Sequence, residues 1–213
     1  MTTVLDRLAG FGIIPVVVID DALQAQHLAD ALVDGGLPVA EITFRTAAAP
    51  AAIKALSSRG DMLVGAGTVT TIDQVDAAIA AGAQYIVSPG TSRAVVERAA
   101  AQGVQAIPGA VTATEIQAAL ELGFEVVKFF PAGVSGGPAA IAALAAPFSG
   151  VRFIPTGGIT PGNLADYMAL PSVVAVGGSW MVKPELIRSG NFGGVYQLTS
   201  DAVAQVNALR AGR

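Results

Sequence analysis

Short apolar runs recur eight times along the chain, and an alanine-rich stretch with helical character follows each of them. The runs occupy residues 12–19, 39–45, 62–69, 84–90, 104–110, 126–131, 151–158 and 173–180. Strands that alternate with helices pair in parallel. Eight such units in a chain of 213 residues fit a closed ring better than an open sheet. The sequence therefore predicts an α/β protein with a (β/α)8 TIM barrel fold, formed as a single domain over residues 1–213.

The stretches between the runs carry helix start signals. Thr71 and Thr112 each stand before a helical stretch as N-cap candidates. Glu115 follows Thr112 at the spacing of a capping box. We also expect a short N-terminal helix over residues 1–10 and a last helix over residues 195–209.

Composition and charge exclude several classes of protein. The chain is 53% hydrophobic and only 13% charged, so we do not expect disorder. A net charge of −4 argues against nucleic-acid partners and anionic membrane surfaces. The absence of cysteine excludes disulfides and thiolate metal sites. No signal peptide and no uninterrupted apolar run of about 18 residues are present, which predicts a soluble, cytoplasmic protein.

Lys128 is conspicuous because it lies inside the apolar run EVVKFFPA. A buried ammonium group is costly unless it is paired or loses its proton. In the run 39–45, alternation places Glu41, Thr43 and Arg45 on one face and apolar residues on the other. Since the apolar face belongs beneath the helices, the polar triplet should point into the barrel, together with Lys128. Such a cluster fits an amine nucleophile with a nearby acid/base group, or a purely structural ion-pair layer.

The other conspicuous side chains favour surface or packing roles. Lys54 and Lys183 lie in polar surroundings and are expected to be solvated. His27, the only histidine, lies in a helical stretch, where we expect it at the surface. Without cysteine and without carboxylates clustered beside a histidine, no metal site is expected. Trp180 fits either packing at the barrel rim or a place near the ligand.

Glycine pairs close the last two runs, in the segments PTGGIT (155–160) and VGGSW (176–180). Barrels often hold phosphate where strands seven and eight end. Glycines let backbone N–H groups approach an anion closely, and Thr156 or Ser179 can add a hydroxyl donor. The same glycines also suit ordinary turns, so both interpretations stay open at this point.

Seven motifs in this order, VAEITFRT, VGAGTV, IVSPG, IPG, VVKFFPA, PTGGI and GGSW, resemble those of the 2-keto-3-deoxy-6-phosphogluconate (KDPG) aldolases. Some members of that family cleave 4-hydroxy-2-oxoglutarate (KHG). The resemblance implies a homotrimeric class I aldolase of the Entner–Doudoroff pathway on a (β/α)8 barrel. It also implies a phosphorylated 2-keto acid as substrate, with no metal and no cofactor beyond the Schiff base on a lysine.

The resemblance also implies roles for individual residues, by their place in the motifs. Lys128 is similar to the family's Schiff-base lysine, and Glu41 to its acid/base residue. By the same resemblance, the pyruvate and its carboxylate would contact Arg45, Thr68, Pro89 and Phe130, and the phosphate would contact Thr156, Gly157, Gly158, Gly178 and Ser179.

One departure from the family pattern concerns the end of the first run. Several relatives carry a basic residue there, whereas this chain has Asp20 and Asp21. This leaves the preferred substrate open among the phosphogluconate, the phosphogalactonate and the hydroxy-oxoglutarate types. A non-catalytic trimer that binds 2-oxo acids or phosphosugars is the alternative from a different class.

Overall fold

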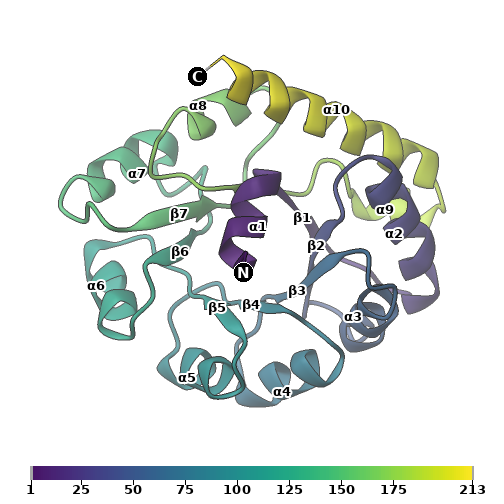
Figure 1. Cartoon of the computed structure of the whole chain (residues 1–213), viewed down its shortest axis with the longest axis horizontal. Helices are drawn as coiled ribbons and strands as arrows, with labels where there is room; N and C mark the ends of the chain where they lie inside the picture. Colours follow the sequence, from purple (N-terminus) through teal and green to yellow (C-terminus); the bar gives the residue numbers. More distant parts are fainter. Residues whose placement is uncertain (1, 213) are drawn as a thin grey trace.

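The structure, a computed structural model, describes residues 2–212 and contains eight strands flanked by helices (Figure 1). The strands are β1 (Ile13–Val17), β2 (Val39–Thr43), β3 (Leu63–Gly67), β4 (Tyr85–Val87), β5 (Gln105–Ile107), β6 (Val126–Phe129), β7 (Arg152–Pro155) and β8 (Val176–Gly178). The helices are α1 (Val4–Phe11), η1 (Ala22–Gln24), α2 (Ala25–Asp34), α3 (Ala49–Ser57), α4 (Ile72–Ala80), α5 (Arg93–Ala101), α6 (Ala113–Glu121), α7 (Gly137–Ala145), α8 (Leu164–Met168), α9 (Pro184–Arg188) and α10 (Phe192–Ala211).

The strands form a curled, parallel sheet around which the helices are arranged (Figure 1). Six strands pair in the order β5-β4-β3-β2-β1-β8, and β6 pairs with β7 in a second ladder. Isolated parallel bridges join the two ladders: Gly109 with Lys128 on one side, and Phe153 with Val173 and Thr156 with Gly177 on the other. The predicted α/β class and parallel pairing are confirmed, while regular pairing is interrupted at these two seams.

Each predicted apolar run contains one strand, but the strands are shorter than the runs. The run 84–90 contributes only Tyr85–Val87 to the sheet, because Pro89 has no N–H to continue a ladder. In the run 39–45 the strand ends at Thr43, so Arg45 lies in the following turn. Apolar runs thus located the strands, and backbone chemistry fixed where they end.

The predicted helix signals are found where the sequence placed them. The Thr112 hydroxyl accepts from the Glu115 N–H and the Glu115 carboxylate accepts in return, which completes the capping box. Thr71 caps α4 in the same way, without the reciprocal bond. The N-terminal helix is Val4–Phe11, with Met1 outside the described residues, and the last helix is longer than expected at Phe192–Ala211.

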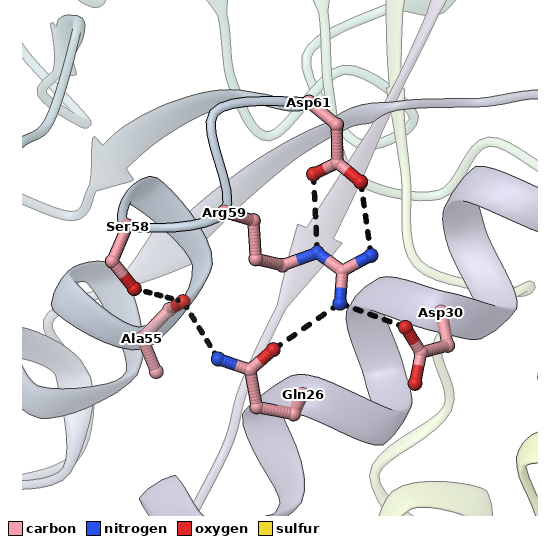
Figure 2. Close-up of polar contacts among 6 residues, drawn as sticks. All are labelled: Gln26, Asp30, Ala55, Ser58, Arg59 and Asp61. Carbon is pink, nitrogen blue, oxygen red and sulfur yellow. Dashed lines mark hydrogen bonds and ion pairs between the residues drawn. The ribbon is translucent and has the colours of Figure 1, made fainter.

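A polar network fastens the outer layer where α2 and α3 meet (Figure 2). Arg59 donates from Nε and Nη2 to both carboxylate oxygens of Asp61, at 3.1 and 2.9 Å. Its Nη1 donates to Asp30 of α2 at 2.7 Å and to Gln26 at 3.2 Å, and Gln26 in turn donates to the carbonyl of Ala55 in α3 at 2.9 Å. The bond from Arg59 holds the pKa of Asp61 below its usual value.

Candidate active site

Lys128 and Glu41 form an ion pair inside the ring of strands. Lys128 Nζ donates to Glu41 Oε1 at 3.0 Å, and the two residues are only 4% and 3% exposed. Lys128 lies on β6 and Glu41 on β2, which belong to different ladders, so their contact crosses the interior of the ring. Strand alternation therefore predicted correctly that both side chains point inward.

Two glycines of β3 make room for neighbouring side chains, Gly67 for the Glu41 carboxylate and Gly65 for the ring of Tyr85. A Cβ added at Gly67 would lie 2.1 Å from Glu41 Oε1, and one added at Gly65 would lie 2.2 Å from the ring of Tyr85. Tyr85 is fully buried, and its hydroxyl donates to the carbonyl of Ala40 at 3.1 Å. Burial, with the nearby charge of Glu41, raises the pKa of Tyr85 well above its usual value. The tyrosine is therefore a neutral wall beside the ion pair.

Phe130 connects the ion pair to a cavity at the ends of the strands. Lys128 Nζ lies 5.3 Å from the centre of the Phe130 ring, within the range of a cation–π contact. Phe130 also lines a cavity of about 320 Å³, whose walls come mainly from segments that follow β1, β6, β7 and β8. The lining residues are Val16, Val18, Arg45, Phe130, Thr156, Gly157, Gly158, Ile159, Gly177, Ser179, Val182 and Pro184.

The cavity wall after β7 has the features of an anion site. Thr156 Oγ1 is buried and has no hydrogen-bond partner within residues 2–212. Gly157 and Gly158 have φ angles of +94° and +79°, which favour glycine. Consecutive residues in such conformations can turn their N–H groups toward one bound anion. The positive φ angles fit either an anion site or an ordinary turn, and the unpartnered Thr156 hydroxyl is the feature that an anion would satisfy.

Gly178 does not line the cavity, although the sequence interpretation included it. Its neighbour Gly177 does, and a Cβ there would lie 2.3 Å from Thr156 Oγ1. Successive strand residues face opposite sides, and Gly178 faces Trp180, to whose ring a Cβ would approach within 2.2 Å. Trp180 therefore packs on the strand instead of lining the cavity.

The candidate carboxylate-binding residues lie in the segments that follow β2, β3 and β4. Arg45 lines the cavity with an exposed side chain, in the turn after β2. Thr68 directly follows β3 and has a φ of +57°, the one non-glycine residue within residues 2–212 with a positive φ. Pro89 follows β4, and its carbonyl lies against Gly109, which bridges to Lys128. Thr68 and Pro89, like Lys128 and Glu41, lie outside the cavity lining.

The side chains expected at the surface are found there. Lys54, Lys183 and His27 are exposed, and the ring of His27 lies 5.5 Å from that of Phe192. No group of three or more histidine, cysteine, aspartate or glutamate side chains within residues 2–212 is arranged to hold a metal ion. No helix in the same range is both long and apolar enough to cross a bilayer.

Sequence reasoning missed half of the cavity wall. Val16 and Val18 are alternate residues along the first run, so the parity argument that found Glu41 could have found them. Pro184 is the first residue of α9, a helix of five residues, and Val182 lies in the loop before it. Asp20 also has a partner that the sequence did not suggest, since Arg188 of α9 donates to it at 2.7 Å.

The chain matches one family model and several known proteins. The model for KDPG and KHG aldolase matches residues 4–198. The 2-dehydro-3-deoxy-phosphogluconate aldolase of Treponema pallidum (strain Nichols) is 47% identical over 210 residues, which are 98% of this chain and 100% of the relative.

Two solved structures share the fold at moderate identity. The KDPG aldolase of Legionella pneumophila, with pyruvate captured at low pH as a covalent carbinolamine intermediate, has a TM-score of 0.89 at 38% identity, covering 92% of this chain and 96% of the other. The 2-keto-3-deoxy-6-phosphogluconate aldolase of Zymomonas mobilis ZM4, solved with 3-phosphoglycerate, has a TM-score of 0.87 at 38% identity, covering 96% and 97%. The chain therefore belongs to the KDPG and KHG aldolase family.

Proposed function

We propose that this protein is a class I aldolase that cleaves 2-dehydro-3-deoxy-6-phosphogluconate to pyruvate and glyceraldehyde 3-phosphate. The observation that carries the proposal is the buried Lys128–Glu41 pair, 3.0 Å apart and next to Phe130 of the cavity wall. A buried amine beside a carboxylate supplies a nucleophile and an acid/base group in one place. The names of the relatives support the same activity.

The first half of the reaction forms the Schiff base. Lys128 passes one proton of its ammonium group to Glu41 and, as the neutral amine, attacks the ketone carbon beside the substrate carboxylate. Glu41 gives that proton to the carbonyl oxygen, and a carbinolamine forms. Glu41, in hydrogen-bond contact with Nζ, accepts the proton from the attacking nitrogen and returns it to the hydroxyl that leaves as water. The product is an iminium that accepts electrons from the adjacent carbon chain.

The second half breaks the carbon–carbon bond. Glu41, directly or through a water, removes the proton of the C4 hydroxyl, and the electron pair of the C3–C4 bond moves into the iminium. Glyceraldehyde 3-phosphate leaves, and an enamine remains on Lys128. Protonation of the enamine carbon by Glu41 and hydrolysis by water then release pyruvate and the free amine.

Substrate recognition divides between the two ends of the site. We assign the pyruvate carboxylate to Arg45, whose guanidinium can bind it in bidentate fashion, and to Thr68, with Pro89 and Phe130 lining the same pocket. The phosphate is assigned to Thr156, Gly157, Gly158, Gly178 and Ser179, with Gly177 as a further glycine of the cavity wall. In this proposal backbone N–H groups and hydroxyls, without a lysine, hold the dianion.

The remaining expectations belong to the same proposal. We propose that the two ladders and the bridges between them form one closed (β/α)8 barrel, and that the chain folds as a single domain. We further propose a cytoplasmic homotrimer that acts in the Entner–Doudoroff pathway and requires no metal or other cofactor. The cleavage of KHG is the second candidate activity, which the family's double name favours.

Covalent trapping tests the chemistry. Incubation with pyruvate and borohydride should add one reduced pyruvate per chain, on a peptide that contains Lys128. Lys128→Met should abolish the adduct, whereas Lys54→Met and Lys183→Met, which change exposed lysines, should keep it. An adduct on either exposed lysine, or none at all, would support a non-catalytic binding protein instead.

A further inference from the structure

An ion pair between Asp20 and Arg188 joins two segments that are 168 residues apart. Arg188 is the last residue of α9, and its Nε donates to Asp20 Oδ2, just beyond β1, at 2.7 Å. The Arg188 side chain is 61% exposed and the Asp20 side chain is 45% exposed. No other ion pair within residues 2–212 connects α9 to the rest of the molecule.

Each partner lies close along the chain to residues that line the cavity. Val16 in β1 and Val18 directly after it line the cavity, and Asp20 follows two residues later. Pro184 lines it from the start of α9, and Arg188 lies one helical turn later on the same face. The ion pair therefore closes the rim between the β1 wall and the α9 wall.

We propose that Asp20 and Arg188 form a latch that holds α9 against the end of β1 and so fixes the width of the phosphate end of the cavity. Both are positioning residues. The latch rests on the proposed function only in naming phosphate as the ligand. It also gives Asp20 a role without contact to the substrate, because its charge is already paired with Arg188.

The size of the effect follows from the exposure of the pair. Exposed ion pairs contribute little to global stability, so breaking the latch should leave the melting temperature nearly unchanged. Without the ion pair, the α9 side of the cavity is no longer fixed, and the cavity binds the phosphate more weakly. The loss of binding free energy is the same in the ground state and in the transition state. Such a loss raises KM and leaves kcat unchanged. We expect KM for the phosphorylated substrate to rise about five-fold.

The test uses Asp20→Ser, Arg188→Ser and the exchanged pair Asp20→Arg/Arg188→Asp in the full-length protein. Both single variants should raise KM for the phosphorylated substrate, and the exchanged pair should restore it to within about two-fold, because the attraction is symmetric. Cleavage of the unphosphorylated substrate and pyruvate trapping at Lys128 should stay unchanged. Arg93→Ser is the matched control, since it breaks the Arg93–Glu97 pair, which is 66% and 57% exposed.

The affinity for 3-phosphoglycerate, measured by calorimetry, tests the latch without catalytic turnover. A failure of the latch proposal can therefore be distinguished from a failure of the aldolase proposal. Weaker binding in both single variants, with recovery in the exchanged pair, would support the latch even if no cleavage is seen. Unchanged binding in the single variants would overturn it. A loss in Arg188→Ser alone would also overturn it, and would indicate direct contact between the arginine and the phosphate.

Discussion

The two ends of the site use different means to hold charge. At the pyruvate end, Lys128 and Glu41 are charged side chains that lie almost fully buried and touch each other. At the proposed phosphate end, glycine backbone and hydroxyls form much of the wall, with Thr156 Oγ1 unpartnered among residues 2–212. In the proposed reaction, side chains perform the chemistry at one end, and the backbone shapes the other.

This difference predicts opposite sensitivities to mutation. A buried charged pair fails when either side chain is replaced, because the remaining charge loses its partner. A glycine cradle loses nothing that a side chain supplied, and fails only when bulk or charge is added. The variants below are chosen to separate these two modes of failure.

The largest effect is expected for Glu41→Gln, which keeps the shape of the side chain and removes its proton transfer. Turnover should fall by about two orders of magnitude or more on every substrate. Glu97→Gln, at an exposed ion pair, is the matched control. The kinetic assay should be paired with a circular-dichroism melt. An unfolded variant, or a folded one with near-normal specific activity, would favour a structural ion pair.

Gly67→Ala should impair the same proton transfer by Glu41 through a steric clash. The new Cβ would lie 2.1 Å from Glu41 Oε1, so the carboxylate must move away from Lys128. A displacement of about 1 Å typically costs about 100-fold in rate, and the loss should appear in kcat. Gly10→Ala, where a Cβ meets nothing within 4 Å, should keep full activity. Equal kcat values in the two variants would show that Glu41 is not positioned by β3.

Gly158→Asp should impair the proposed phosphate end and leave the chemistry at Lys128 and Glu41 unchanged. A carboxylate at this position repels the phosphate, so kcat/KM should fall about ten-fold or more for phosphorylated substrate and little for KHG. Gly158→Asn has the same shape and the same strain at a φ of +79°, without the charge. The ratio of specificity constants in the two variants isolates the charge. Equal losses on both substrates would mean that Gly158 only shapes a turn.

The smallest effect concerns acid stability, which should depend on the outer layer and on neither end of the site. Asp61 has a folded pKa below its usual 3.8, because Arg59 donates to it. Its contribution is present above that value and is lost as pH falls through the folded pKa. Arg59→Gln should therefore lower Tm slightly at pH 7, and the difference in Tm from the unchanged protein should shrink as pH falls below the usual pKa of 3.8. A gap that persists in acid would point to lost packing.

Alternation explains why much of the site was predictable from sequence. Lys128 and Glu41 lie inside strands, where a period of two fixes the direction of each side chain once the apolar face is known. Arg45, in the turn after β2, also faces the cavity as predicted, whereas Gly178 is the last residue of β8 and its neighbour Gly177 lines the cavity instead. The contribution of Val182 and Pro184 depends on where the segment around α9 lies relative to strands far away in the sequence, which local residue patterns do not encode.

The seams between the two ladders have a consequence for how activity arises during folding. Lys128 belongs to the two-stranded ladder and Glu41 to the six-stranded one, so neither ladder alone contains both the proposed nucleophile and its proposed acid/base partner. The appearance of pyruvate reactivity during refolding should therefore report the docking of the ladders, after the circular-dichroism signal of helices and strands has recovered. The rate at which pyruvate reactivity appears would then measure the rate at which the two ladders dock.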